Sequence, residues 1–240
     1  INLSKASKNE IIIPEPLPNP IFRFLIVGSS NSGKTNLIKN LLTRKQFHYK
    51  DLFKKNIWLF CPTVNLSDSY DFIQDIETDD RKRIFKNYDE NIIQQIKNEQ
   101  TIIKNNLKEF NLKQAPQLLL IFDDMLNNLP TTTMNSFIEL FTSGRHFNIN
   151  ILLVSQSYYS IPLIIRRNCT HLCFFEGMNK RDLTKINNEE LPYTDNFNFF
   201  DEYKKLNRYE FIFVDAFNKI YYRNLKEKLN NNNEIENNNL

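Results

Sequence analysis

A chain of 240 residues that is 41% hydrophobic and 25% charged is long enough for one large core and lies near the average composition of globular domains. Its net charge of +3 is too small to indicate a nucleic-acid-binding protein by itself, so any DNA contact has to come from a local patch. The sequence has neither an apolar run of bilayer-spanning length nor a signal-peptide pattern, so we expect no membrane span and no secretion.

The beginning and the end of the sequence differ from its middle. Residues 1–20 carry prolines at alternate positions from 14 to 20, which predicts an extended, proline-rich arm rather than a helix. Residues 226–240 contain the asparagine-rich run LNNNNEIENNNL, which predicts a flexible tail. Residues 21–225 are then expected to form the folded domain.

The middle of the chain alternates between expected strands and helices. Nearly continuous apolar runs, typical of strands buried on both faces of a parallel sheet, lie at Phe22–Val27, Ile57–Cys61, Leu118–Phe122, Ile151–Val154 and His171–Phe175. Helical patterns lie at Thr35–Leu42, Asn91–Phe110 and Met134–Thr142. A β-hairpin is expected from Tyr209–Val214 and Ile220–Arg223, with its turn at Ala216–Lys219. This order predicts a three-layer α/β fold with a mainly parallel central sheet and a C-terminal hairpin.

The cysteines show no pattern of a disulfide framework or a zinc site. Cys61, Cys169 and Cys173 are the three cysteines, and the last two are not spaced as a C-x-x-C pair. We therefore expect reduced thiols in the core of a protein from a reducing compartment.

The loop after the first strand fits a P-loop. Residues 28–35 read GSSNSGKT and match G-x-x-x-x-G-K-[ST], with a strand before them and a helix after them. Small residues let backbone N–H groups wrap a triphosphate, and the helix N-terminus adds its positive dipole end. Lys34 is expected to reach the β- and γ-phosphates, and the Thr35 hydroxyl to bind Mg²⁺. The predicted nucleotide-binding residues are Gly28, Ser29, Ser30, Asn31, Ser32, Gly33, Lys34, Thr35 and Asn36.

An acidic pair ends the third expected strand. A carboxylate at the end of a buried strand is costly unless a cation is near, and nucleotide-bound Mg²⁺ is such a cation. Asp123 is therefore predicted to hold Mg²⁺ as the Walker B acid. Asp124 is placed to orient or deprotonate an attacking water, although it could instead cap the following loop.

Polar residues also end the next strand, and a Gly-Arg pair precedes it. Gln156, after Ser155, is placed to sense the γ-phosphate and position water, or is an ordinary polar strand end. Arg145 is either a charge at a helix C-terminus or an arginine finger given to a neighbouring subunit. Arg166 and Arg167 form the second candidate for that finger.

These motifs together resemble a known family. The segments LIFDDM, SGRHFNINILLVSQ and IPLIIRRNCTHLCFF are similar to the FtsK/HerA superfamily, above all to the DNA-packaging ATPases of poxvirus-type large DNA viruses and virophages. The resemblance covers roughly residues 20–177. It implies a RecA-like P-loop ATPase domain over residues 21–225 that uses ATP and Mg²⁺.

The resemblance also implies partners and roles. It implies a homo-oligomeric ring, a pentamer or a hexamer, that pumps double-stranded DNA into a preformed viral capsid and contacts a capsid or vertex protein. The place of action would be the virus assembly site, in the virus or the host cytoplasm. By motif position, the trans arginine finger falls on Arg145 and the sensor glutamine on Gln156. Many relatives have Asp-Glu where this chain has Asp123-Asp124, and this departure weakens the support that the resemblance gives to a catalytic role of Asp124.

One motif favours a different class of protein. Residues 179–182 read NKRD and match the NKxD guanine-binding motif of GTPases after an apolar strand. A GTPase-type nucleotide switch would also need D-x-x-G, yet Asp124 is followed by Met-Leu-Asn. A P-loop nucleotide kinase is the other alternative, and the acidic pair and Gln156 do not suit it.

Basic clusters are the candidates for gripping DNA. They are residues 81–83, 54–55 and 166–167. A translocase must hold phosphates without recognising bases, so lysine and arginine on loops would suffice. The segment between Pro62 and Pro116 is long enough to supply such loops, and the sequence does not single out the residues.

Overall fold

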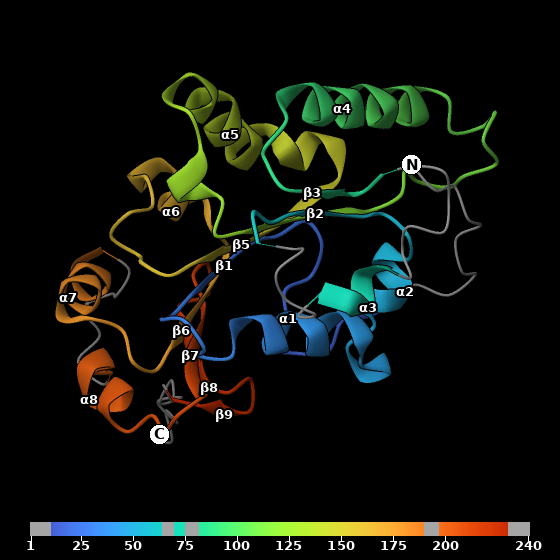
Figure 1. Cartoon of the computed structure of the whole chain (residues 1–240). Coiled ribbons are helices and arrows are strands. Elements are labelled where there is room, and N and C mark those ends of the chain that lie inside the picture. The colour runs from blue at the N-terminus through green and yellow to red at the C-terminus, as the bar shows by residue number, and fades with distance from the viewer. Residues whose placement is uncertain (1–10, 64–69, 75–81, 190–196, 230–240) are drawn as a thin grey trace, which may run out of the picture.

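The computed structural model describes residues 11–63, 70–74, 82–189 and 197–229 (Figure 1). The predicted arm before residue 11 and the predicted tail after residue 229 lie outside the described residues. Among the described residues, no helix combines the length and the apolar character that crossing a membrane requires.

One sheet of nine strands runs through the described molecule in the order β3-β2-β4-β5-β1-β6-β7-β8-β9. Pairing from β3 to β6 is parallel, and pairing from β6 to β9 is antiparallel. The strands are β1 Arg23–Val27, β2 Ile57–Phe60, β3 Ile84–Phe85, β4 Leu118–Asp123, β5 Ile149–Ser155, β6 His171–Phe175, β7 Phe211–Asp215, β8 Ile220–Arg223 and β9 Glu227–Lys228. The expected mainly parallel sheet is confirmed, and β7 and β8 pair as the expected hairpin.

Helices cover both faces of the sheet, as the three-layer prediction requires (Figure 1). Along β1, Leu25 and Val27 join the core cluster beneath α4 and α5, whereas Phe24 and Ile26 join the cluster beneath α1 and α2. The helices are α1 Lys34–Thr43, α2 Tyr49–Phe53, α3 Asp71–Gln74, α4 Glu90–Asn105, α5 Thr131–Ser143, α6 Leu163–Asn168, α7 Lys180–Glu189 and α8 Phe199–Lys204.

Helix α4 ends earlier than its apolar spacing predicts. Asp89 caps its start by accepting hydrogen bonds from the backbone N–H groups of Asn91 and Ile92. At the other end, the Asn106 side chain donates to the Ile102 carbonyl at 3.0 Å, so the asparagine competes with the next helical turn. The predicted extension to Phe110 is therefore wrong, and Phe110 is 36% exposed.

The described part of the proline-rich segment lies on the domain. Leu17 donates its backbone N–H to the Pro14 carbonyl in a turn, and Ile13 and Leu17 are buried against the α1 side of the core. The Tyr49 hydroxyl donates to the Pro18 carbonyl at 2.7 Å. Residues 11–20 thus pack against the neighbouring helices. At the other end, β9 pairs with β8 and gives residues 227–228 of the expected tail an ordered place at the sheet edge.

Candidate nucleotide site

The P-loop joins the carboxyl end of β1 to the N-terminus of α1. Asn31 and Gly33 have positive φ angles of 61° and 106°, which lets the chain fold back on itself. A Cβ atom at Gly28 would lie 2.6 Å from the Ser32 Oγ and 2.7 Å from the Phe175 Cβ, so only glycine fits there. The sequence-predicted cradle is therefore built by backbone geometry. Asn36 is exposed on the first turn of α1.

Lys34 is held inside this loop. Its Nζ donates to the carbonyls of Gly28 and Ser29 at 2.8 and 2.7 Å. Burial lowers the pKa of the lysine, and the nearby carboxylates of Asp124 and Asp123 oppose that shift. An anion in the loop would offer this buried cation a better partner than neutral carbonyls.

Asp123 ends β4 next to the P-loop threonine. The Tyr70 hydroxyl donates to its Oδ2 at 2.8 Å, and the same Tyr70 is hydrogen-bonded to the Thr35 side chain. Burial raises the pKa of Asp123 to about 6, with a further rise from Asp124, while Tyr70 and Lys34 oppose the shift. Sequence reasoning missed Tyr70, because no pattern ties it to a carboxylate 53 positions later.

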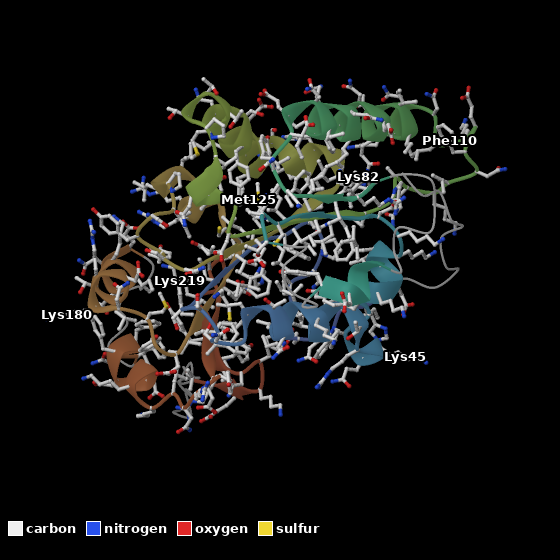
Figure 2. The ribbon with its side chains drawn as sticks, in the orientation of Figure 1. Lys45, Lys82, Phe110, Met125, Lys180 and Lys219 are labelled. Carbon is white, nitrogen blue, oxygen red and sulfur yellow. The ribbon has the colours of Figure 1, made fainter. Side chains whose placement is uncertain are left out.

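Gln156 joins the second carboxylate to the P-loop. Its Nε2 donates to the Asp124 Oδ2 at 2.7 Å, and its Oε1 accepts from the Ser30 Oγ at 3.3 Å. This is possible because β5 lies between β4 and β1, so the residue after β5 sits between the ends of those two strands. Asp124 has a φ angle of 50°, and the buried Met125 that follows it lies near the centre of Figure 2.

The site fits a magnesium-bound nucleotide. The Ser32 Oγ and the Asp124 Oδ1 are buried and have no hydrogen-bond partner among the described residues. Buried polar atoms without partners are rare, so a ligand or water must complete them. The Thr35 hydroxyl and the Asp123 carboxylate offer the oxygen ligands that Mg²⁺ prefers. These features lie together at the carboxyl edge of the parallel strands.

Arg145 lies at the amino end of β5, at the other end of the strands from the P-loop. It belongs to the short 3₁₀ turn Gly144–Phe147, which leads into the amino end of β5. The seven residues of β5 span roughly 20 Å, so this side chain is remote from its own P-loop. The Arg145 side chain is exposed and makes no hydrogen bond or ion pair with any other described residue, whereas its backbone carbonyl accepts from the Asn148 N–H at 3.4 Å.

Arg166 is a structural residue, which corrects its assignment as a candidate finger. It is 3% exposed, and its guanidinium pairs with both carboxylate oxygens of Glu189 at 2.8–2.9 Å. It also lies 5.0 Å from the ring centroid of Tyr158. A guanidinium satisfied in this way is not available to a neighbouring nucleotide, whereas Arg167 is exposed.

The NKxD motif is also structural. Asp182 is 1% exposed, and its Oδ1 accepts hydrogen bonds from the Ser157 Oγ and the Tyr159 N–H at 2.9 and 2.7 Å. Its Oδ2 accepts from the Asn179 Nδ2 at 2.9 Å. The carboxylate therefore ties the loop after β5 to the start of α7 and is not available to a guanine base.

Burial removes part of the proposed DNA grip as well. Arg83 is 2% exposed and lies 5.2 Å from the ring centroid of Trp58. Because Arg83 and Arg166 are both buried, the clusters at 81–83 and 166–167 offer DNA fewer basic side chains than their sequences indicate. Lys82 and Arg167 remain exposed, and residue 81 lies outside the described residues.

Comparison with known sequences identifies relatives of this chain. A sequence profile of the family described as "Poxvirus A32 protein" matches residues 14–194. The DNA packaging protein OPG160 of Variola virus is 32% identical over 162 residues, which cover 64% of this chain and 53% of that protein. OPG160 of Monkeypox virus is 32% identical over the same length and is covered to 47%. The chain spans about half the length of the curated relatives it matches.

Solved structures share the fold. The genome packaging NTPase B204 from Sulfolobus turreted icosahedral virus 2, in complex with AMP, aligns over 86% of this chain and 98% of its own, with a TM-score of 0.58 and 17% identity. EssC (ATPases 2 and 3) from Geobacillus thermodenitrificans aligns over 72% of this chain and 35% of its own, with a TM-score of 0.52 and 15% identity. These likenesses confirm the predicted RecA-like architecture.

Proposed function

This chain belongs to the poxvirus A32 protein family, and from that membership and its site geometry we propose that it hydrolyses ATP to drive double-stranded DNA into a viral capsid. The single observation that carries the proposal is the contact of Gln156 with both Asp124 and the P-loop residue Ser30. That contact places an amide between a carboxylate and a phosphate cradle, where an attacking water would stand.

Each site residue has a role in this proposal. Lys34 would leave the carbonyls of its loop and bind the β- and γ-phosphates. Asp124 would accept the proton of the attacking water, and Gln156 would orient that water. Thr35 and Asp123 would hold Mg²⁺, with the Tyr70 hydroxyl displaced from between them. The bound Mg²⁺ would neutralise charge that develops on the transferred phosphoryl group.

The remote position of Arg145 supports a multimeric motor. A finger that lies roughly 20 Å from its own P-loop can complete only the site of another chain. We therefore infer a homo-oligomeric ring, a pentamer or a hexamer, in which Arg145 of one subunit faces the γ-phosphate of its neighbour. A capsid or vertex protein would be the docking partner, and the virus assembly site the place of action.

Subunit mixing tests this arrangement. ATP hydrolysis per chain should rise with protein concentration, and further with double-stranded DNA, on size-fractionated protein. Lys34→Ala should be nearly inactive because it removes the cation that binds the β- and γ-phosphates. Arg145→Ala should be nearly inactive because an arginine finger is worth about 10³–10⁵ in rate. Mixed rings should regain activity wherever an intact P-loop meets an intact Arg145. No rescue in rings shown to be mixed would refute a trans role and move attention to Arg167.

A further inference from the structure

The direction of the bound nucleotide follows from the strand order. Asp123, Asp124 and Gln156 lie at the ends of β4 and β5, on one side of β1, so the γ-phosphate end belongs there. The opposite side of β1 holds β6 and β7. The P-loop follows β1 and fixes the phosphates between these two sides. With the γ-phosphate end toward β4 and β5, the nucleoside must extend toward β6 and β7.

An exposed aromatic residue lies on that side. Tyr209 lies two residues before the start of β7 and is 53% exposed. Its ring Cδ1 is 3.5 Å from the position that a Cβ on Gly33 would take, so the ring lies against the P-loop itself. A base leaving the P-loop on this side meets the ring.

The backbone at Tyr209 is unusual. Residues 207–210 form a turn in which the Glu210 N–H donates to the Asn207 carbonyl at 3.0 Å. Tyr209 is the third residue of this turn and has a φ angle of 72°, a region that favours glycine or asparagine. A bulky side chain in this conformation costs stability, and such strain is concentrated at functional sites.

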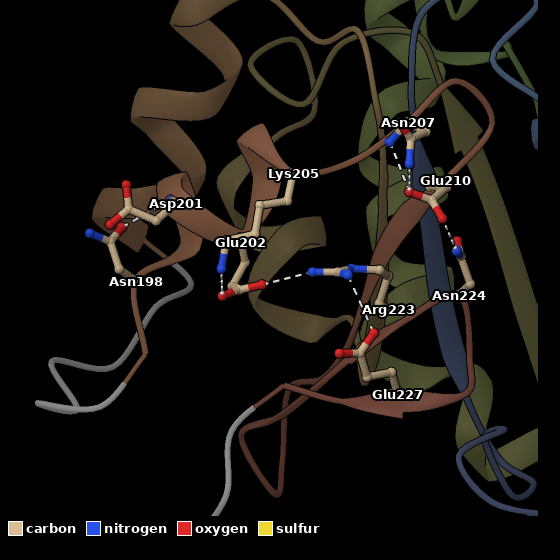
Figure 3. A network of polar contacts seen from close by, with 9 residues as sticks. All are labelled: Asn198, Asp201, Glu202, Lys205, Asn207, Glu210, Arg223, Asn224 and Glu227. Atoms are coloured by element: carbon tan, nitrogen blue, oxygen red, sulfur yellow. Dashed lines mark hydrogen bonds and ion pairs between the residues drawn. The ribbon is translucent and has the colours of Figure 1, made fainter.

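A polar network holds the turn in place (Figure 3). The Glu210 carboxylate accepts from the Asn207 backbone N–H at 2.8 Å and from the Asn224 Nδ2 at 2.9 Å. The Glu210 carbonyl in turn accepts from the Glu176 N–H, which ties the turn to the end of β6. The Arg208 guanidinium lies 4.8 Å from the Tyr209 ring centroid. The ring is therefore positioned before any ligand binds.

We propose that Tyr209 is the stacking platform for the nucleobase of the bound nucleotide and that Arg208 restrains its ring. The proposal rests on the nucleotide site proposed above. It adds a binding contact that the P-loop pattern does not contain. A base–aromatic stack is worth about 1–3 kcal/mol, which at 1.4 kcal/mol per tenfold corresponds to about 5- to 150-fold in affinity.

Inorganic triphosphate separates the base from the phosphates. Calorimetry with Mg²⁺ should show that Tyr209→Ala weakens a non-hydrolysable ATP analogue by about tenfold and leaves inorganic triphosphate unchanged. Tyr209→Phe should keep wild-type affinity for both, because it retains the ring. Phe217→Ala is the matched control, because Phe217 is 88% exposed on the β7–β8 turn, at the other end of β7 from Tyr209. It should change the affinity for neither ligand.

Tyr209→Gly distinguishes a binding role from a packing role. Glycine relieves the positive φ, so this variant should keep or raise the midpoint of thermal unfolding while it loses affinity for the ATP analogue. Equal binding of the analogue by Tyr209→Ala and wild type, or equal losses for analogue and inorganic triphosphate, would overturn the platform alone. Wild-type protein that binds neither ligand would overturn the nucleotide site, and the platform with it.

Discussion

Replacing Asp182 with alanine tests whether the NKRD segment is structural or binds guanine. The side chain is 1% exposed and accepts hydrogen bonds from Ser157, Tyr159 and Asn179. Hydrogen bonds to a charged group are worth about 1.5–3 kcal/mol each, and their loss is less than additive in one network. We therefore expect Asp182→Ala to lower the free energy of unfolding by about 4 kcal/mol.

Urea unfolding measures this loss. With a slope of about 3 kcal/mol per molar for a domain of this size, the midpoint should fall by about 1 M. Asp201→Ala is the matched control, because the Asp201 side chain is 60% exposed and, among the residues that the structure describes, forms an ion pair only with Lys204, at 3.7 Å. That control should cost less than about 1 kcal/mol.

Nucleotide preference completes the test. The ratio of kcat/KM for ATP to that for GTP should be the same in wild type and Asp182→Ala, measured in urea-free buffer at a temperature where both are folded. An unchanged urea midpoint together with the loss of a clear GTP preference would show that Asp182 recognises guanine. The structural assignment of the motif would then be wrong.

Three further predictions follow from the site and its surroundings. Asp124→Asn should still bind Mg²⁺ and ATP but lose turnover by about a hundredfold or more, and normal turnover would remove Asp124 as the base. The pKa of Asp123 is about 6 in the folded state against an ordinary 3.8, so the folded protein holds a proton that the unfolded chain has lost, and wild-type stability falls as the pH rises from about 4 to about 6. The urea midpoint of Asp123→Asn should therefore rise relative to that of wild type between pH 4.5 and 7.5. A constant difference between the two midpoints would contradict the shift. Arg166→Ala should cost about 3 kcal/mol in urea unfolding because it removes both hydrogen bonds to Glu189 and the contact with the Tyr158 ring, although Glu189 keeps its pairing with Lys185 at 3.3 Å; Arg167→Ala should change stability by less than about 0.5 kcal/mol.

Local pattern was sufficient for the long buried strands and for the phosphate cradle. Buried parallel strands are continuous apolar runs, so His171–Phe175 is identical to β6, and the α/β order follows from the alternation. The P-loop is one contiguous segment whose small residues answer a steric need, as the close approach of Ser32 and Phe175 to Gly28 shows. Its identification therefore needs no tertiary information.

Short or irregular elements escaped prediction because little in their own sequence specifies them. The strands β3 and β9 have two residues each and exist through pairing with β2 and β8. Helix α4 was predicted too long because apolar spacing continues beyond Asn106, where a side-chain hydrogen bond ends the helix. In these cases the outcome depends on a partner or a single competing contact rather than on periodicity.

Tertiary structure alone decided which polar residues act together. From the sequence, Arg166 and Asp182 cannot be distinguished from exposed functional residues. In the fold they are buried, where Arg166 pairs with Glu189 and Asp182 accepts a hydrogen bond from Ser157, so both are structural. Conversely, Tyr70 and Tyr209 lie in no motif, yet the fold carries one to Asp123 and the other to Gly33. The reason is physical: a sequence motif records neighbours along the chain, whereas desolvation and hydrogen bonding depend on neighbours in space, which the sheet order sets.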